Sequence, residues 1–130
     1  MIVADANLLV HLVFPGEHSA LADRVYSRDP DWAVPLLCVS ELRNVAWKFV
    51  RRKEISLTQA IDALERASIV VVNREYSVAT STVLDLAARS GCSAYDCEYV
   101  ALAQALGVPL VTADQQVLRA FPTIARPLAD

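Results

Sequence analysis

The sequence predicts an α/β fold, a three-layer sandwich in which helices flank a mainly parallel central sheet. Short apolar runs alternate with amphipathic stretches along the chain, an order typical of a parallel sheet with crossover helices. One of these runs, residues 68–73, is β-branched without alternation, as expected for a strand covered on both faces. The 130 residues, of which 55% are hydrophobic and 21% charged, are enough to bury a core, so we expect one domain over residues 1–130.

Two strands and two helices are predicted in the first part of the chain. Residues 1–4 are expected to form a buried strand that ends at Asp5, and residues 6–14 a short helix that a Pro-Gly pair stops. Residues 18–28 carry apolar side chains at helical spacing. A turn rich in Asp and Pro then leads into a second strand, residues 32–35.

The middle of the chain is predicted to contain two helices and a third strand. From Leu42 onwards, apolar side chains recur at the spacing of a helix packed on a core. Ser56 and Gln59 form a capping-box pattern that starts the next helix. The β-branched run of residues 68–73 then predicts the third strand, with parallel pairing.

Three helices and one strand are predicted in the last part of the chain. Residues 75–90 and 93–106 have helical patterns, and a glycine stops each of them. Residues 108–112 form a further apolar strand, and residues 115–121 a short helix before a tail that contains proline.

The composition excludes several classes of protein. A formal charge of −3 excludes a globally basic nucleic-acid-binding protein. The longest charge-free stretch, residues 99–113, is interrupted by Gln, Gly and Pro, so no transmembrane helix is expected. No basic residue precedes the first apolar run and Asp5 interrupts it, which argues against a secretory signal. We therefore expect a cytoplasmic protein with no membrane partner.

The cysteines and histidines argue against disulfides and zinc. Cys38, Cys92 and Cys97 are odd in number and form no C-x-x-C pair, so we predict buried or half-buried thiols. With only two histidines in the chain, a zinc site built from His and Cys is not expected.

Four acidic residues fall at predicted strand ends or helix starts. Asp5 ends the first strand, Glu41 lies just beyond the second, Asp96 lies in the first turn of a helix, and Asp114 ends the last strand. Taken singly, each is better explained as a helix cap or as a first-turn acid that the helix dipole favours. The Ser93-x-x-Asp96 spacing, for example, resembles a capping box.

Taken together, the four acids predict a metal site. Strand ends on one edge of a parallel sheet converge, which would bring the four carboxylates close together. Like charges at that range repel and raise one another's pKa values unless a cation is present. Oxygen ligands without His or Cys favour a hard divalent ion, Mg²⁺ or Mn²⁺, and metal-assisted phosphoester chemistry.

Polar residues near the four acids are candidates for orienting them. Asn7, two residues after Asp5, offers an amide, and Thr112, two residues before Asp114, offers a hydroxyl on the same side of its strand. Ser40 and Ser93 could assist, although capping their helices is the better explanation for both.

These residues stand in motifs that resemble those of a PIN-domain ribonuclease of the VapC toxin type. The motifs are residues 3–7 (VADAN), 40–45 (SELRNV), 95–103 (YDCEYVALA) and 109–114 (PLVTAD). The resemblance extends from residue 1 to about residue 121. It implies a PIN-like three-layer sandwich.

The resemblance also implies a function. Asp5, Glu41, Asp96 and Asp114 would hold Mg²⁺ or Mn²⁺ for the hydrolysis of RNA phosphodiester bonds, with Asn7 and Thr112 in support. A homodimer, and a cognate antitoxin protein that neutralises the toxin, are implied as partners. Whether Asp114 binds the metal directly or through water, and whether there is one metal ion or two, stay open.

Two residues depart from the family pattern. Cys97 stands where the family often has Ala, and Glu98 is an acid outside the usual four. Two residues beyond Asp96 on a helix, Glu98 should point away from it, so we expect a solvated or second-sphere group.

A local basic cluster could contact RNA. Without the four acids, the formal charge changes from −3 to +1, so the surface outside the proposed site is close to neutral. Cations gather on and after one helix and could neutralise phosphates or, equally well, complement the helix dipole; they are Arg43, Lys48, Arg51, Arg52 and Lys53. Trp47 lies off the apolar stripe of that helix and is a candidate interface residue.

Two other functions compete with this interpretation. A phosphatase of the haloacid dehalogenase type also has an Asp after its first strand and needs Mg²⁺. It requires D-x-D, however, where this chain has Asp5-Ala6-Asn7, and a lysine late in the chain, whereas Lys48 and Lys53 both lie in the first half. An inactive PIN-like module that only binds RNA or protein would have no reason to tolerate four clustered acids.

Overall fold

A computed structural model describes residues 1–129 of the chain. Within this range the chain forms five strands and seven helices. In chain order they are β1 (Ile2–Ala4), α1 (Ala6–Val13), α2 (Ser19–Arg28), β2 (Trp32–Pro35), α3 (Leu37–Arg51), α4 (Leu57–Val70), β3 (Glu75–Tyr76), α5 (Thr80–Ser90), α6 (Ala94–Leu106), β4 (Leu110–Val111), α7 (Gln115–Ala120) and β5 (Ala125–Arg126).

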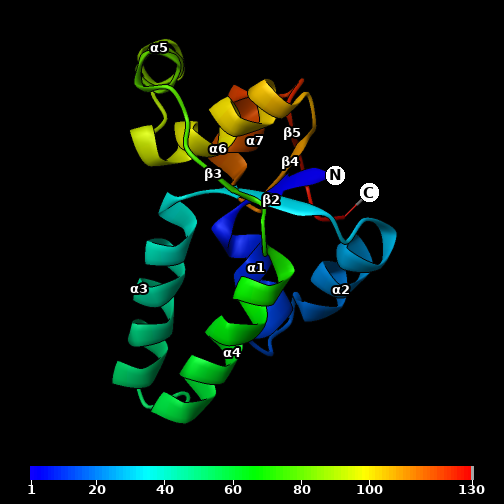
Figure 1. Cartoon of the computed structure of the whole chain (residues 1–130), viewed down its shortest axis with the longest axis vertical. Helices are drawn as coiled ribbons and strands as arrows, with labels where there is room; N and C mark the ends of the chain where they lie inside the picture. The colour runs from blue at the N-terminus through cyan, green and yellow to red at the C-terminus, as the bar shows by residue number, and fades with distance from the viewer. Residues whose placement is uncertain (130) are drawn as a thin grey trace.

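The strands form one parallel sheet in the order β3-β2-β1-β4-β5. Helices α1 to α4 lie on one side of the sheet and α5 to α7 on the other (Figure 1). The predicted three-layer α/β sandwich with a parallel sheet is therefore confirmed. Strands β2 and β3 lie on one side of β1, whereas β4 and β5 lie on its other side. The direction in which successive strands are placed therefore reverses between β1 and β4. In sheets of this kind, ligands bind at the carboxyl ends of the strands beside such a reversal.

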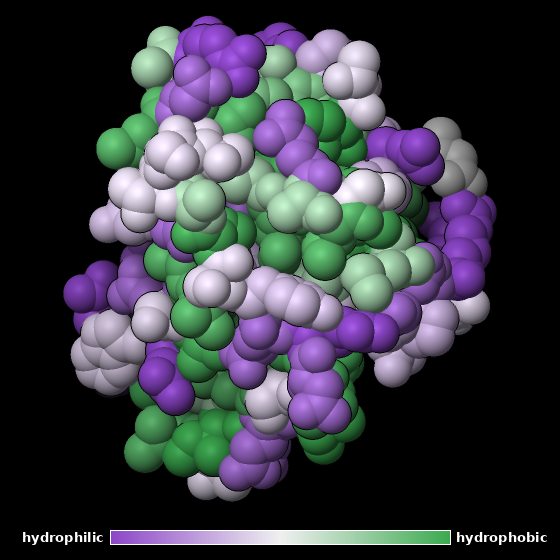
Figure 2. Space-filling model, turned by 45° about the horizontal axis from the view of Figure 1, so that its top comes forward, coloured by the Kyte–Doolittle hydropathy of each residue, from purple (hydrophilic) through white to green (hydrophobic). Residues whose placement is uncertain are grey.

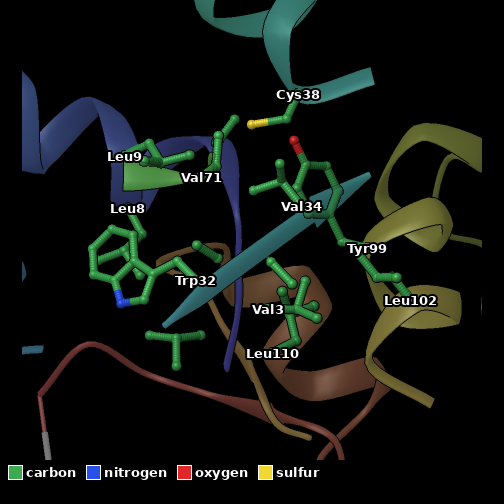
Figure 3. Close-up of a cluster of buried hydrophobic side chains, with 14 of the residues drawn as sticks. Val3, Leu8, Leu9, Trp32, Val34, Cys38, Val71, Tyr99, Leu102 and Leu110 are labelled. Carbon is green, nitrogen blue, oxygen red and sulfur yellow. The ribbon is translucent and has the colours of Figure 1, made fainter. Parts of the chain in front are cut away.

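The core lies on both faces of the central strands. Val3 of β1 and Leu110 of β4 are fully buried beside Trp32 and Val34 of β2 (Figure 3). The indole N–H of Trp32 donates to the carbonyl of Asp29 at 2.7 Å, so this large residue is buried with its polar group satisfied. On the outside, hydrophobic residues stay visible between polar ones, as is normal for a folded domain (Figure 2).

The predicted strand at residues 68–73 is wrong. Helix α4 continues to Val70, and the chain then turns; the third strand is Glu75–Tyr76. Ile69 and Val72 are 71% and 61% exposed, the opposite of a strand covered on both faces. The helix prevails because Ala60, Ala63 and Ala67 are buried at helical spacing on a helix that packs against α3 and α1, which outweighs local β propensity.

Three further element boundaries differ from the predictions. Residues 75 and 76 are a strand, so the helix predicted over residues 75–90 begins only at Thr80. Helix α3 begins at Leu37, five residues before the apolar stripe that starts at Leu42, so Glu41 lies inside a helix. Strand β5 pairs with β4 in the tail, where no strand was predicted.

The thiols agree with the sequence analysis. Cys38, Cys92 and Cys97 are free and buried. Within residues 1–129, no helix combines the length and the hydropathy that a membrane span requires.

Candidate active site

The candidate site lies at the carboxyl ends of β1 and β4. Asp5 follows β1 and caps helix α1, because its Oδ1 accepts a hydrogen bond from the backbone N–H of Ala6 at 2.7 Å. Asp114 follows β4 and caps α7: its Oδ1 accepts from the backbone N–H groups of Gln116 at 2.8 Å and Val117 at 3.2 Å. Both acids therefore are helix caps, and both also lie at the strand-order reversal. A role as a helix cap is thus compatible with a place in the candidate site.

Thr112 connects the two strand ends. Its side chain is fully buried, and its Oγ1 donates to Oδ2 of Asp5 at 2.6 Å and accepts from the backbone N–H of Asp114 at 3.0 Å. Nδ2 of Asn7 donates to both Thr112 Oγ1 and Asp5 Oδ2 at 3.3 Å, while Asn7 Oδ1 accepts from the backbone N–H of Ala113 at 3.2 Å. The threonine and the asparagine thus hold the loop after β1 against the loop after β4.

We expect Thr112→Val to destabilise the protein by about 1–3 kcal/mol, because the methyl group removes the buried hydroxyl that donates to Asp5 and accepts from Asn7 and from the Asp114 N–H. The free energy of unfolding from urea titrations tests this. Thr58→Val, on an exposed position of α4, is the control and should stay within about 0.5 kcal/mol of the parent. Equal losses in the two variants would contradict the connecting role of Thr112.

Helices α3 and α6 contribute the other two acids. Asp96 lies in the first turn of α6, where Ser93 is the N-cap and accepts from the Asp96 N–H at 3.1 Å; the capping role predicted for Ser93 is confirmed. Glu41 lies in the second turn of α3 and is half-buried. The capping role expected of Ser40 is wrong, because α3 begins at Leu37 and Ser40 is an exposed residue inside it.

Tyr99 is a residue of this site that the sequence analysis missed. It is 2% exposed, and its hydroxyl donates to Oε1 of Glu41 at 2.6 Å. The available signal was its position three residues after Asp96, which places both side chains on one face of α6.

Electrostatics links the four acids. The pKa of Asp5 is raised to about 6, mainly by burial and also by the negative charges of Glu41 and Asp96, against the lowering effect of the Thr112 and Ala6 hydrogen bonds. Burial also raises the pKa of Glu41, with additional repulsion from Asp96. Asp96 likewise has a pKa raised by burial and then by the charge of Asp114. Each acid therefore lies within electrostatic range of at least one other.

Glu98 lies near Glu41 of the candidate site. Its charge raises the pKa of Glu41, after burial and the charge of Asp96. It thus belongs to the negative surroundings of Glu41, in line with the second-sphere alternative expected from the sequence.

The donor set fits a hard divalent cation. The ligands on offer are carboxylate, hydroxyl and amide oxygens, which suit Mg²⁺ or Mn²⁺ and not zinc. In the part of the chain that the structure describes, no three His, Cys, Asp or Glu side chains converge into a preformed metal-binding group. Mg²⁺ is usually held by one or two carboxylates with water completing its coordination, so a loose set of acids with raised pKa values suits it better than a closed cage.

Most of the predicted basic cluster lies away from the acids. Arg43 is two residues from Glu41 on α3, but Arg51 is ten residues from Glu41 and thus about 15 Å along the helix. Arg52 and Lys53 follow in the tight turn before α4, where Lys53 adopts a positive φ of 59°. The structure therefore separates these cations from the carboxylates, and places Lys48 between the two groups. Trp47 is 54% exposed on the same helix, as its place off the apolar stripe predicted.

Comparisons with known proteins identify the family. The profile of the PIN domain matches residues 2–122. The chain is 30% identical over 129 residues to a protein of Pyrobaculum aerophilum named Ribonuclease VapC3, across 97% of this chain and 98% of that protein.

Two solved structures share the fold. PAE2754 from Pyrobaculum aerophilum has a TM-score of 0.78 at 23% identity, over 98% of this chain and 83% of that one. A toxin-antitoxin complex from Klebsiella pneumoniae has a TM-score of 0.72 at 15% identity, over 100% of this chain and 99% of that one. The resemblance seen in the four sequence motifs is confirmed, and the chain belongs to the PIN domain family.

Proposed function

We propose that this protein is a Mg²⁺- or Mn²⁺-dependent endoribonuclease and the toxin of a toxin-antitoxin pair, with one domain over residues 1–130. The observation that carries the proposal is that Asp5, Glu41 and Asp96, beside the strand-order reversal, have pKa values raised by burial and by neighbouring negative charges, with Asp114 acting on Asp96. Two comparisons support it: a relative named Ribonuclease VapC3, and the shared fold of a toxin-antitoxin complex.

In this proposal the four acids bind the cation, either directly or through water. Once bound, a divalent cation lowers the pKa of a coordinated water and stabilises negative charge on the scissile phosphate. Asp5 is held in place by Thr112, Asn7 and Ala6: its Oδ2 accepts two hydrogen bonds, whereas its Oδ1 accepts only that of the Ala6 N–H and keeps acceptor capacity. Asp114 uses Oδ1 for the cap of α7, which leaves Oδ2 available. Asn7, Thr112 and Ser93 orient these acids, and Ser40, exposed beside Glu41, is available to substrate.

The proposed partners are RNA, a cognate antitoxin protein and a second copy of the chain, in the cytoplasm. The four carboxylates repel an RNA backbone unless a cation neutralises them, so cation and substrate binding are expected to be coupled. Positive charge extends along one helix, from the edge of the site to the α3–α4 turn, and is supplied by Arg43, Lys48, Arg51, Arg52 and Lys53.

The cluster at the α3–α4 turn gives a testable consequence. Replacing Arg51, Arg52 and Lys53 together by Gln should weaken RNA binding and reduce the slope of log K against log salt by about 2, since each contact to a single strand contributes about 0.7. Fluorescence anisotropy at several salt concentrations measures this, with Arg89→Gln on α5 as control. An unchanged slope would mean that these cations serve only the helix dipole.

The experiment that tests the proposed function is cleavage of a mixed pool of tRNA, rRNA fragments and mRNA with Mn²⁺ or Mg²⁺. EDTA and Asp5→Asn are the controls, and the product ends are sequenced. Cuts that disappear in both controls would establish a metal-dependent ribonuclease and reveal its target. Cuts that persist in EDTA would contradict the proposal. Metal binding without RNA cleavage would direct the assay to other phosphoesters.

A further inference from the structure

Tyr99 is a buried residue whose hydroxyl group donates a hydrogen bond to one acid of the site. Its ring packs in the core of α6, β1 and β2, and only 2% of the residue is exposed. The hydroxyl donates to Oε1 of Glu41 at 2.6 Å, across 58 residues of sequence. That distance is typical of a hydrogen bond to an ionised carboxylate, which is stronger than one between neutral groups.

The surroundings of the hydroxyl hold it in place. Cys38 is one turn before Glu41 on α3 and is 1% exposed. The Tyr99 oxygen points toward the Cys38 sulfur (Figure 3), and the two groups are close enough for each to affect the pKa of the other. A thiol is a weak acceptor, so Glu41 is the strong acceptor available to this buried O–H. Cys38, in turn, limits where the phenol group can move.

Glu41 needs such a contact to stay in the site. It has three rotatable side-chain bonds, it is only half-buried, and Asp96 and Glu98 repel it. With no donor in place, the carboxylate would gain by rotating away from these charges into water. The contact occupies Oε1 from the protein side and leaves Oε2 free of the tyrosine.

We propose that Tyr99 is a positioning residue that holds the Glu41 carboxylate in the orientation in which it binds the cation. This inference rests on the proposed function, because it takes Glu41 as a ligand. The tyrosine touches neither substrate nor metal, and acts through Glu41 alone. Loss of a residue that orients a metal ligand typically weakens metal binding by about 10–100-fold.

The test is the Mn²⁺ affinity of Tyr99→Phe, measured by titration calorimetry and by the spin resonance signal of free Mn²⁺. The ring and its packing remain, so the melting temperature in EDTA should stay close to that of the parent. We expect the dissociation constant for Mn²⁺ to rise at least about tenfold, with a parallel loss of RNA cleavage. Tyr76→Phe is the matched control: its hydroxyl accepts from Arg74 at 3.3 Å and bonds none of the four acids, so Mn²⁺ affinity should not change.

Glu41→Gln separates this inference from the proposed function. It should weaken Mn²⁺ binding by itself, and adding Tyr99→Phe to it should cause no further loss if the tyrosine acts only through Glu41. Parent-like affinity in Tyr99→Phe, together with a loss in Glu41→Gln, would overturn the inference and leave the proposed function standing. Parent-like affinity in Glu41→Gln would overturn both the inference and the assignment of Glu41. Losses that add up fully in the double variant would also overturn the inference, because Tyr99 would then act independently of Glu41.

Discussion

Asp96→Asn is expected to lower the rate of RNA cleavage by about a thousandfold or more and to leave the fold intact. Asn keeps the shape of Asp96 but loses the charge that the proposed cation needs, at the position where the field of Asp114 also acts. The N-cap of α6 survives, because Ser93 bonds the backbone N–H of residue 96 and does not depend on its carboxylate charge. Initial cleavage rates at saturating Mn²⁺ measure the loss.

The same variant should be more stable than the parent when metal is absent. Burial and the charge of Asp114 both raise the pKa of Asp96, so its ionised form costs stability in the folded state at neutral pH. The melting temperature in EDTA at pH 7 should therefore rise. Asp85→Asn, on an exposed α5 position paired with Arg89, is the control for both measurements and should change neither markedly. Full activity in Asp96→Asn would remove Asp96 from the mechanism, and a fall in stability would contradict the clustering of charge.

The sequence predicted the parts of the site that local patterns encode. Asp5 and Asp114 end apolar runs, and the end of a parallel strand has a defined place in the sheet, so their convergence followed from chain order. Thr112 and Asn7 followed from their spacing to these acids. The fold class followed in the same way, because alternating elements leave few arrangements other than a parallel sheet between helices.

The parts that depend on tertiary contacts could not be predicted. Residues 68–73 have strong β propensity, but the burial of Ala63 and Ala67 continues helix α4, and only the packed structure decides between the two. The hydrogen bond of Tyr99 to Glu41 joins positions 58 residues apart on two helices whose relative rotation the sequence does not state. Strand β5 has only two residues, and its pairing with β4 becomes evident only in the assembled sheet.

The metal-free protein is expected to lose stability as the pH rises from about 4.5 to about 6.5. Burial raises the pKa of Asp5 from 3.8 to about 6, and the pKa values of Glu41 and Asp96 shift in the same direction. In this window the folded state holds more protons than the unfolded state, so the free energy of unfolding falls with pH. The shift of Asp5 alone corresponds to about 3 kcal/mol. Urea titrations in EDTA at half-unit pH steps measure the slope. Asp5→Asn should flatten the slope, whatever it does to the absolute stability.

A bound cation should cancel this loss or reverse it. Metal binding requires ionised carboxylates, so its contribution grows over the same pH range in which the metal-free protein weakens. At about one hundred times its dissociation constant, Mn²⁺ contributes about 2.7 kcal/mol, close to the loss expected from Asp5. The free energies of unfolding with and without Mn²⁺ should therefore nearly coincide at pH 4.5 and differ by about 3 kcal/mol at pH 7. Thr112→Val, which disturbs the anchoring of Asp5 and keeps all four acids, should retain the separation in reduced form. Parallel curves for the parent would mean that the acids repel one another without binding a cation, since a cation that binds ionised carboxylates must change the pH slope.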